Sequence, residues 1–587
     1  MKPGPAAGER HWAGPLWSRL VIGGLLVALG ASLVLRPFAS LAVLVILLVA
    51  AMAVAGVGEL VGRDPGPARW RRVRGAAYLA GALVMLAWPA ATIRVIAVTV
   101  AATLLVEGLA DVILARGLGG TARLNAGLAA AASIVLGLLA LAWPDVSVLV
   151  VAVTFGARVL ITGGRQVVAF VKGDDLPLLS RRTRPAARGG RLGLTGTVLG
   201  AALAAALALV SLVLHAGTPV PDAFYEPPAM LPAEPGMLLR SEPYDSPEIP
   251  AGANAWRILY TTTRDEGVPA LGSGLVIAPA ADGAAPTPRR VVAWAHGTTG
   301  FANGCAPSIL PDGLAAGAMT VQDQVVERGW TMVATDYVGL GTEGAHPYLI
   351  GQGEARSVLD AIRAAGQLKE AAVAAGTVVW GHSQGGHAAL WTGVLAPSYA
   401  PELRIEGVAA LAPASDLPGL IDSLGTVTGG ELFASYVLAG YTAAYPDVRA
   451  GDVVRPGARI LAEEMGSRCL SERATLVSLL TALTLDKNIW SGNPDTGAFG
   501  SRLRENVPAG PIAAPLLVAQ GAADTLVEPA VQAAYVRGRC EAGQPVDYRT
   551  YPGRGHVQLV EPDSPAVPDL LSWTAARFEG APARSNC

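Results

Sequence analysis

One serine lies in a motif that could make it a nucleophile. The sequence Gly-His-Ser-Gln-Gly at residues 381–385 places Ser383 two residues from a glycine on either side. A short β-type run at 376–380 precedes the motif, and the run at 386–391 that follows it can begin a helix. A G-x-S-x-G sequence between a strand and a helix is typical of a nucleophile elbow, whose glycines permit a strained turn. The motif predicts acyl-transfer chemistry at Ser383, provided that the chain supplies the partners.

The partners of such a serine are a histidine base and a carboxylate that orients it. In the α/β-hydrolase arrangement the chain order is serine, acid, histidine. Of the seven histidines only His387 and His556 follow Ser383, and His387 lies one helical turn further on, where its side chain cannot turn back to the hydroxyl. His556 is therefore the predicted base. Asp524, directly after a strand-like run, is the predicted acid. Asp416 is the alternative acid. Asp524 could instead serve as a helix N-cap.

The oxyanion that forms on attack needs two converging backbone N–H groups. Gln384, the residue after the serine, is expected to supply one of them. The second is expected from Thr298, in the glycine-containing loop after a strand-like run at 290–295. His296 in the same loop is expected to be structural. No histidine and cysteine spacing resembles a zinc site, and we expect neither a metal nor an organic cofactor.

The elements that must position these residues alternate between short β-rich runs and helical runs. That alternation predicts a mostly parallel sheet in an α/β domain over residues 255–587. A helix is expected from Ala355 to Lys369, and a helical insertion at about 415–510 is either a moving lid or a fixed addition. The expected strands are 255–263, 271–278, 290–295, 331–336, 377–381, 405–411, 515–520 and 546–551.

The first 215 residues have a different character, because apolar runs of near membrane-spanning length follow one another. Lys and Arg exceed Asp and Glu by 12 in this part, whereas the remainder has an excess of 14 acidic residues. We expect a cytoplasmic tail at 1–19 and a seven-span helical bundle at 20–215, with no cleaved signal peptide. The runs are 20–36, 39–61, 76–90, 92–114, 125–142, 146–163 and 193–215.

Basic residues alternate between the ends of these runs. The tail and the connections expected on its side carry 17 Lys and Arg, against Arg36 and Arg94 on the other side. The positive-inside rule then places the tail in the cytoplasm and everything after His215 outside the cell. The alternative, a nucleic-acid patch, is disfavoured because the basic segments alternate with apolar runs. The expected location is the cell membrane, with no nucleic-acid partner.

Three proline turns, at Arg36-Pro37, Trp88-Pro89 and Trp143-Pro144, recur about 52–55 residues apart and predict three hairpins. Glu59, Asp111 and Gln166 stand at equal distances past these prolines. Such groups can mark an ion path, but at interfacial depth we expect solvated groups or pairs with neighbouring arginines. The pattern resembles the HdeD-like short-repeat membrane family over about 20–170, a resemblance that implies no catalytic residue.

A proline-rich segment at 216–254 is interpreted as an extended linker that packs on the next domain. All four cysteines, Cys305, Cys469, Cys540 and Cys587, lie in the part expected outside the cell, which predicts two disulfides. Three connectivities are possible. We favour Cys305–Cys469 with Cys540–Cys587.

Residues 221–587 resemble the secretory lipase (LIP-type) family of α/β-hydrolases. Besides the elbow, Asp524 and His556, the resemblance rests on Asp222–Tyr225 with Pro227-Pro228, His296–Thr298, Cys305–Ser308, Asp336–Gly341 and Leu359–Arg363. It implies hydrolysis of acyl esters, triacylglycerols included, through a serine acyl-enzyme without a cofactor, and it implies a helical lid. The predicted function is a membrane-anchored extracytoplasmic lipase or carboxylesterase whose partners are an ester or lipid substrate and the bilayer.

Two alternatives remain open. An acyltransferase acting on envelope lipids or glycans would use the same residues but needs an acceptor site, which the sequence does not reveal. A membrane stress or transport protein could instead carry the hydrolase fold as a non-catalytic module. The complete set of serine, acid and histidine disfavours that second alternative.

Overall fold

The fold was analysed in a computed structural model of the chain. Before residue 219 the structure describes residues 16–35, 68–87, 93–143 and 191–215, with scattered positions at 46–60 and 160–171. From residue 219 it describes the chain to residue 587 except 265–266, 281–286, 473–474 and 485–487. The chain separates into two compact units, one ending at Val213 and the other containing nearly all of the remainder. Each unit is described by itself.

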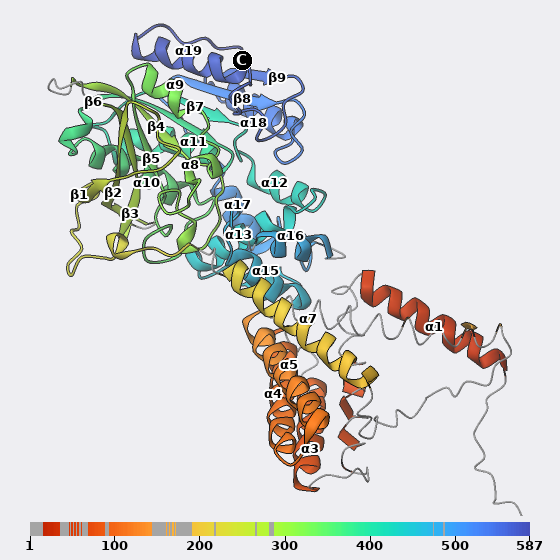
Figure 1. Ribbon diagram of the computed structural model, residues 1–587. Helices are drawn as coiled ribbons and strands as arrows, with labels where there is room; N and C mark the ends of the chain where they lie inside the picture. The colour runs from red at the N-terminus through yellow and green to blue at the C-terminus, as the bar shows by residue number, and fades with distance from the viewer. Residues whose placement is uncertain are drawn as a thin grey trace, which may run out of the picture. The chain divides into compact units, whose positions relative to one another are not determined.

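The N-terminal unit is helical. Its described helices are α1 (Leu16–Leu35), α3 (Ala68–Ala87), α4 (Ile93–Ala115), α5 (Gly120–Ala142) and α7 (Arg191–His215), drawn in red to yellow in Figure 1. Five of the seven predicted apolar runs thus coincide with helices. Among the described residues α5 is the one helix that is long and apolar enough to cross a membrane, and a shorter apolar stretch lies at Thr197–Val213. The seven-span arrangement therefore stays a prediction, and Pro37, Pro89 and Pro144 lie outside the described residues.

Close packing joins α4 to α5, and an ion pair joins α3 to α4. A Cβ on Gly108 would lie 2.7 Å from Ile134 Cγ1, so α4 and α5 approach closely because this position has no side chain. Arg74 Nη1 lies 3.0 Å from Asp111 Oδ1. Asp111 is thus paired with an arginine, which is the arrangement expected for an interfacial acid. Glu59 and Gln166 lie outside the described residues.

The C-terminal unit is built on a nine-stranded sheet with the order β1-β2-β3-β5-β4-β6-β7-β8-β9. The pairs β1/β2, β2/β3 and β3/β5 are antiparallel, and the other neighbouring pairs are parallel. All eight predicted strands are present. The strands are β1 (Leu238–Pro243), β2 (Ala253–Thr263), β3 (Pro269–Pro279), β4 (Arg289–Ala295), β5 (Thr331–Thr335), β6 (Val373–His382), β7 (Arg404–Leu411), β8 (Leu516–Gly521) and β9 (Asp547–Tyr551).

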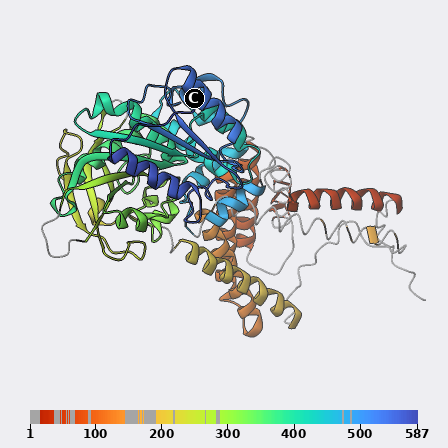
Figure 2. The same ribbon diagram turned by 90° about the horizontal axis from the view of Figure 1, so that it is seen from above.

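Helices cover both faces of the sheet (Figure 1). Because side chains alternate along a strand, Val378 and Trp380 of β6 pack on one face and Val379 on the other. The first face carries α8 (Gly313–Ala316), α9 (Gln322–Glu327) and α19 (Ala566–Phe578). The second carries α10 (Gly351–Ala365), α11 (Gln384–Tyr399) and α18 (Pro529–Glu541), and Figure 2 shows the same layers from above. The helix predicted at 355–369 is α10, which begins and ends four residues earlier.

The segment interpreted as a linker contains regular structure. Its residues 238–243 form β1, which pairs with β2 at the edge of the sheet. Prolines are tolerated on an edge strand, because one side of the strand donates no ladder hydrogen bonds. Asp222 accepts a hydrogen bond from Phe224 N and lies 2.9 Å from Arg257 Nη1. Part of the segment therefore belongs to the fold of the C-terminal unit.

The insertion predicted at 415–510 lies between β7 and β8 and is helical. Its helices are α12 (Leu417–Leu424), α13 (Gly430–Ala444), α14 (Ala450–Val453), α15 (Arg459–Gly466), α16 (Thr475–Thr484) and α17 (Gly497–Glu505). The disulfides Cys305–Cys469 and Cys540–Cys587 join the pairs that we favoured. The first of them ties the insertion to the loop that follows β4.

Candidate active site

Ser383 lies at a strained turn between β6 and α11. Its backbone has φ 57° and ψ −117°, which is a left-handed conformation that is unusual for a residue with a side chain. A Cβ on Gly381 would clash with the carbonyl of Gly385, and a Cβ on Gly385 would clash with the carbonyl of Ala295. Only glycine fits these two positions, so the motif has the geometry of a nucleophile elbow.

His556 and Asp524 lie together although 32 residues separate them. His556 follows β9, Asp524 follows β8, and His556 Nδ1 is 2.8 Å from Asp524 Oδ2. Because a carboxylate can only accept, Nδ1 carries the proton and Nε2 is left with a lone pair. His556 Nε2 is buried and has no hydrogen-bond partner among the described residues. This histidine thus has the tautomer that a general base needs.

Asp524 is held as an acceptor of several hydrogen bonds. Burial pushes the pKa of Asp524 up, but the hydrogen bond and the electrostatic interaction with His556, with the N–H groups of Val527 and Leu526, outweigh burial and leave that pKa below its ordinary value. Gln520 Nε2 donates to the same carboxylate at 3.0 Å. The carboxylate also accepts hydrogen bonds from two backbone N–H groups of the following turn. Asp524 therefore caps this turn, as an N-cap residue would, and also binds His556.

His382, the residue before the serine, was not singled out from the sequence. Its Nε2 donates to the carbonyl oxygen of His556 at 3.0 Å, and the two rings lie with centroids 4.7 Å apart. Burial lowers the pKa of His382 to about 3, so this ring stays neutral. His382 therefore connects His556 to the turn that carries Ser383. Its position inside the motif was the only signal in the sequence.

The two predicted oxyanion donors border the same pocket as Ser383. Neither the backbone N–H of Thr298 nor that of Gln384 donates a hydrogen bond within the described part of the chain. The Thr298 hydroxyl lies 2.8 Å from the hydroxyl of Tyr348. Two unengaged amides beside a serine can stabilise a developing negative charge on a carbonyl oxygen.

The pocket over Ser383 is apolar and almost filled. Its free volume is about 20 Å³, room for about one water molecule. Helices α12 and α13 of the insertion supply much of its wall. The lining residues are Thr298, Tyr348, Leu349, Ser383, Gln384, Ala414, Leu420, Leu424, Phe433, Val437, Leu526 and Val527.

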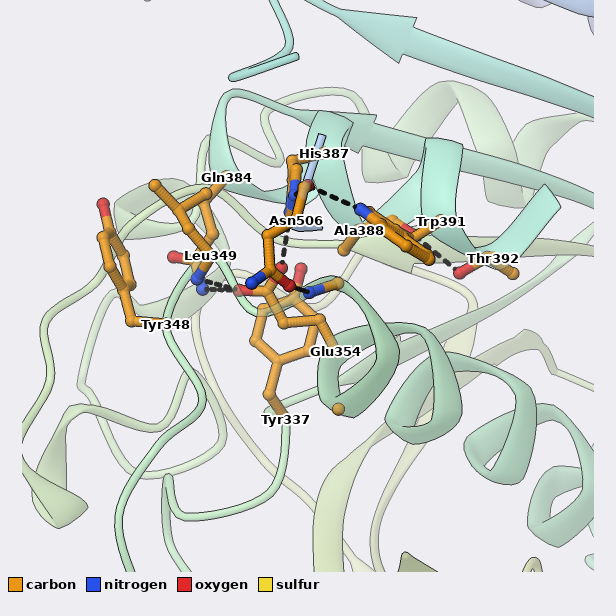
Figure 3. A network of polar contacts seen from close by, with 12 residues as sticks. Tyr337, Tyr348, Leu349, Glu354, Gln384, His387, Ala388, Trp391, Thr392 and Asn506 are labelled. Carbon is orange, nitrogen blue, oxygen red and sulfur yellow. Dashed lines mark hydrogen bonds and ion pairs between the residues drawn. The ribbon is translucent and has the colours of Figure 1, made fainter. Parts of the chain in front are cut away.

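A second histidine and carboxylate pair lies beneath the elbow, and Figure 3 shows it at the centre of a polar network. His387 Nδ1 lies 3.0 Å from Glu354 Oε2, and His387 Nε2 lies 2.8 Å from the carbonyl oxygen of Asn506. Both side chains of the pair are fully buried. A carbonyl oxygen only accepts, so Nε2 carries a proton, and the contact with Glu354 needs a second one. The pair therefore holds one more proton than a carboxylate beside a neutral histidine.

Glu354 also positions Gln384, the residue that follows Ser383. Its Oε1 accepts from Gln384 Nε2 at 2.7 Å and from Leu349 N at 3.0 Å. The other hydrogen of Gln384 Nε2 points to His346 Nε2 at 2.8 Å. With three donors around it, Glu354 is best described as a carboxylate and His387 as an imidazolium. The sequence did not predict this pair, because 33 residues separate its members.

Asn506, at the end of the insertion, completes the network. Its carbonyl oxygen accepts from both His387 Nε2 and Trp391 Nε1, and its Oδ1 accepts from Gly351 N at 3.0 Å. The insertion is thereby tied to the N-terminal ends of α10 and α11. Burial and hydrogen bonding on both sides make this an ordered, fully satisfied contact.

The remaining candidates have other roles. Asp416, the alternative acid, is the N-cap of α12 and accepts from Gly419 N at 3.3 Å. His296 is buried, and its Nδ1 donates to the carbonyl oxygen of Gly297 at 2.6 Å, while Nε2 lies at the longer distance of 3.3 Å from the carbonyl oxygen of Asp336. Burial lowers the pKa of His296 to about 4, so it is neutral near pH 7. A structural role fits this residue, as expected.

Comparisons with known proteins agree with this architecture. Residues 315–586 match the secretory lipase family, and residues 21–86, 73–130 and 128–178 match a short repeat of unknown function (DUF308). Lipase 6 of Candida albicans is 26% identical over 406 residues, which are 63% of this chain and 83% of that lipase. The secreted triacylglycerol lipase LIP7 of Malassezia globosa is 27% identical over 409 residues, which cover 62% and 81% of the two chains.

A solved structure supports the fold. The closed state of Candida antarctica lipase A superposes with a TM-score of 0.52 at 20% identity, covering 62% of this chain and 87% of that one. At this identity the likeness concerns the fold, and it confirms the predicted α/β-hydrolase domain with a mostly parallel sheet. Both resemblances found in the sequence are confirmed. The C-terminal part matches the secretory lipase family, the N-terminal part matches the short repeat, and the protein is a hydrolase of the lipase and esterase class.

Proposed function

We propose that the protein is a serine lipase or carboxylesterase in which Ser383, His556 and Asp524 form the catalytic triad. The observation that carries the proposal is the state of His556: Nδ1 is bonded to Asp524 at 2.8 Å, while Nε2 is buried and unengaged. This ring lies against His382, directly before the strained serine. A base with one free lone pair, on a ring that packs against the turn carrying the serine, is the arrangement that serine acylation requires.

The reaction follows from these roles. Ser383 Oγ attacks the ester carbonyl carbon while His556 Nε2 takes the hydroxyl proton, and Asp524 stabilises the resulting imidazolium. The N–H groups of Thr298 and Gln384 donate to the oxyanion of the tetrahedral intermediate. His556 then gives its proton to the leaving alkoxide, so the alcohol departs and an acyl-enzyme remains. Water, deprotonated by the same nitrogen, releases the carboxylic acid and restores Ser383.

The pocket indicates the class of substrate. Its walls are mostly aliphatic and aromatic, which suits the acyl chain of an ester, triacylglycerols included. A free volume of about 20 Å³ cannot hold such a chain. We infer that α12 and α13 move apart on binding and act as the lid of the site. A neutral, apolar acyl group gains most from that enclosure, because burial removes its surface from water.

We further propose that the N-terminal unit anchors the enzyme in the cell membrane with seven spans, and that the hydrolase domain lies outside the cell. The support is the asymmetry of basic residues, the helices at five of the seven apolar runs and the family of secreted relatives. Reporter fusions after Gly66 and after His215 test this arrangement. A reporter active only in the cytoplasm should work at the first site and fail at the second, and equal activity at both sites would refute it.

Ester turnover by the full chain in nanodiscs tests the catalytic proposal. We expect hydrolysis of p-nitrophenyl esters over several chain lengths, and a Ser383→Ala loss of about 10⁴-fold or more in kcat. Equal turnover by the variant would sink the mechanism. An added alcohol distinguishes hydrolysis from acyl transfer, because release that depends on the alcohol would assign the enzyme to the transferases.

A further inference from the structure

A second cavity of the C-terminal unit is much larger than the pocket over Ser383. Its free volume is about 570 Å³, against about 20 Å³ for that pocket. Its walls come from α10 and α11 on one side and from α13 and α17 of the insertion on the other. A cavity of this size can hold a small organic molecule. Among the described residues none lines both cavities, so the larger one is a separate site.

Basic side chains outnumber acidic ones in the wall of this cavity. Arg264, Arg356 and Arg502 line it, against one carboxylate, Glu505, among the described residues. We name the cavity lined by these three arginines the arginine cleft. Glu505 is engaged with Arg502, because its Oε2 lies 2.7 Å from Arg502 Nη1, and Asp447 Oδ2 lies 3.2 Å from Arg502 Nη2. The carboxylate in the wall therefore does not compensate the charge of Arg356.

Arg356 has no anionic partner in the described part of the chain. Its Nη1 donates to the carbonyl oxygen of Arg264 and its Nη2 donates to Gln352 Oε1 at 3.0 Å, and both of these acceptors are neutral. Its Nε is buried without a hydrogen bond. Asp360, one turn further along α10, is paired with Arg363 at 2.8 Å instead. A partly buried guanidinium with only neutral acceptors favours an anion beside it, because its charge is incompletely solvated.

Aromatic rings supply apolar surface in the same cleft. The indole N–H of Trp391 donates to the carbonyl oxygen of Asn506 at 2.8 Å, so the part of this side chain left for a ligand is apolar. The Tyr445 ring also lines the cleft, and the Arg502 guanidinium lies 4.7 Å from its centroid. A ligand that suits this wall joins an anionic group to an apolar body.

We propose that the arginine cleft binds a short- or medium-chain monocarboxylate, with the carboxylate on Arg356 and the alkyl chain against Trp391 and Tyr445. A guanidinium matches the two oxygens of a carboxylate, and each Nη of Arg356 keeps one hydrogen for them. A hydrolase of the lipase and esterase class releases one carboxylic acid for every ester that it cleaves. The ligand is thus generated where the enzyme acts, and its binding in the cleft does not depend on which residues perform the cleavage.

The loop between β5 and α10 connects the arginine cleft to the pocket over Ser383. His346 of this loop lines the cleft, whereas Tyr348 lines the pocket. His346 Nε2 accepts from the Gln384 side chain at 2.8 Å, and the Tyr348 hydroxyl lies 2.8 Å from that of Thr298. Gln384 and Thr298 are the two proposed oxyanion donors, so the loop contacts both of them.

Helix α13 makes a second connection between the two cavities. Its last residue, Ala444, borders the cleft, and its Phe433 and Val437 border the pocket over Ser383. A ligand held between α13 and Arg356 of α10 ties the insertion to the rest of the fold, and it opposes the movement of α13 that admits an acyl chain. The bound acid should therefore lower kcat, a consequence that rests on the proposed function.

Calorimetric titration of hexanoate tests the site in a Ser383→Ala chain, in which turnover does not disturb the measurement. The full chain is held in nanodiscs of neutral lipid, and empty discs give the heat of partitioning. We expect a Kd near or below about 1 mM, and binding at least about tenfold weaker when Arg356→Gln is added. Arg328→Gln is the matched control, because Arg328 also donates to a carbonyl oxygen, at 3.0 Å, and lies over an aromatic ring, but does not line the cleft. Its Kd should stay within about twofold.

Two further measurements guard against a local loss of structure in Arg356→Gln. Ala444→Trp fills the cleft from an exposed position without removing a hydrogen-bonding side chain, and it should weaken hexanoate binding at least about fivefold. Acetate should bind at least about tenfold more weakly than hexanoate, because it lacks most of the apolar chain. Equal Kd values with and without Arg356→Gln would overturn the proposal, and so would acetate or inorganic phosphate that binds as tightly as hexanoate.

Turnover of p-nitrophenyl butyrate by the chain with Ser383 intact measures the consequence for activity. Hexanoate that competes in the pocket over Ser383 raises only the apparent KM, whereas hexanoate in the arginine cleft should also lower kcat, by about twofold or more at saturation. Each variant is compared with its own activity without hexanoate. The effect on kcat should disappear in Arg356→Gln and persist in Arg328→Gln, and an equal effect in both would contradict the coupling. If binding that depends on Arg356 is found in a chain that hydrolyses no ester, the cleft stands and the proposed function falls.

Discussion

Two histidine and carboxylate pairs flank the start of α11, and they are opposites. In the pair of His556 and Asp524 one ring nitrogen is bonded and the other is unengaged. In the pair of His387 and Glu354 both ring nitrogens are bonded, one to the carboxylate and one to a backbone carbonyl. The same two residue types thus leave one ring nitrogen of the histidine available in the first pair and neither ring nitrogen available in the second.

The difference lies in what each environment offers the second nitrogen. His556 faces the elbow, where no acceptor among the described residues engages Nε2, so its lone pair is available for a proton. His387 faces Asn506 O, which forces a proton onto Nε2 and removes any basic function. A histidine beside a carboxylate is therefore not by itself a catalytic base. The distinguishing feature is the partner of the nitrogen that points away from the carboxylate.

Among the substitutions in the two pairs, Asp524→Asn should cause the largest loss of activity. The amide can donate to Nδ1, which would move the proton of His556 to Nε2 and leave no base beside Ser383. We expect kcat to fall about 10⁴-fold with little change in KM, as in triads that lose their acid. Stopped-flow or steady-state turnover of a p-nitrophenyl ester measures the effect.

Asp416→Asn is the matched control for that change. Asp416 was the alternative acid, and it caps α12, a role that asparagine fills equally well. Turnover within about threefold of the parent is expected. If the two variants lost activity to a similar extent, the assignment of Asp524 would be wrong.

Glu354→Gln should break the second pair with a smaller effect on catalysis. The substitution leaves an imidazolium without its charge partner, and breaking a buried pair costs about 3–5 kcal/mol of stability. Because Glu354 holds the side chain of Gln384, we expect kcat to fall about 10- to 100-fold. KM should move less than threefold, since neither Glu354 nor His387 is placed against the substrate, and the shape of the pH profile should stay unchanged.

The double variant Glu354→Gln with His387→Gln sharpens this test. It replaces the charged pair with two neutral amides that can bond to each other, so more than half of the lost stability should return. Urea unfolding followed by tryptophan fluorescence gives the comparison. A double variant that is no more stable than the single one would argue against a charged pair at this position.

The proposed triad could be predicted from the sequence because each of its members follows a strand. Chain order and a small number of histidines left His556 as the base, and the position after β8 indicated Asp524. The pair of Glu354 and His387 had no such signal, because it joins α10 to α11 across the fold. His382 was hidden for another reason: its contact to His556 depends on how the loop after β9 folds back.

Other elements show the limits of pattern reading. β1 was interpreted as part of a linker, since the prolines of the surrounding segment resemble an extended connection more than an edge strand. The apolar composition of α16 was visible in the sequence, but which of its faces is buried depends on Arg468 and Cys469, which bind the hydroxyl side. The spacing of apolar residues predicts that an amphipathic helix forms. Its tertiary contacts decide which face of the helix is buried.

The remaining buried histidines make the stability of the fold depend on pH, and each of them is expected to have a smaller effect than the substitutions above. Burial lowers the pKa of His296 to about 4, of His346 to about 3 and of His382 to about 3. As the pH falls from 6 to 4, the unfolded chain binds protons on these residues that the folded chain does not, so the folded state loses stability. Asp336 opposes this trend, because burial raises its pKa to about 6 and the folded state then binds the proton first.

Three histidines against one aspartate leave a net of two protons, so these four residues together lower stability by about 2.7 kcal/mol per pH unit in this window. His346→Gln should make the measured slope about 1.4 kcal/mol per pH unit shallower, and Asp336→Asn should make it about 1.4 kcal/mol per pH unit steeper. Denaturant unfolding at pH 6, 5 and 4 measures all three slopes. Because the two variants are expected to change the slope in opposite directions, a general loss of stability cannot imitate the result, and parallel curves for the three proteins would contradict neutral burial of these histidines.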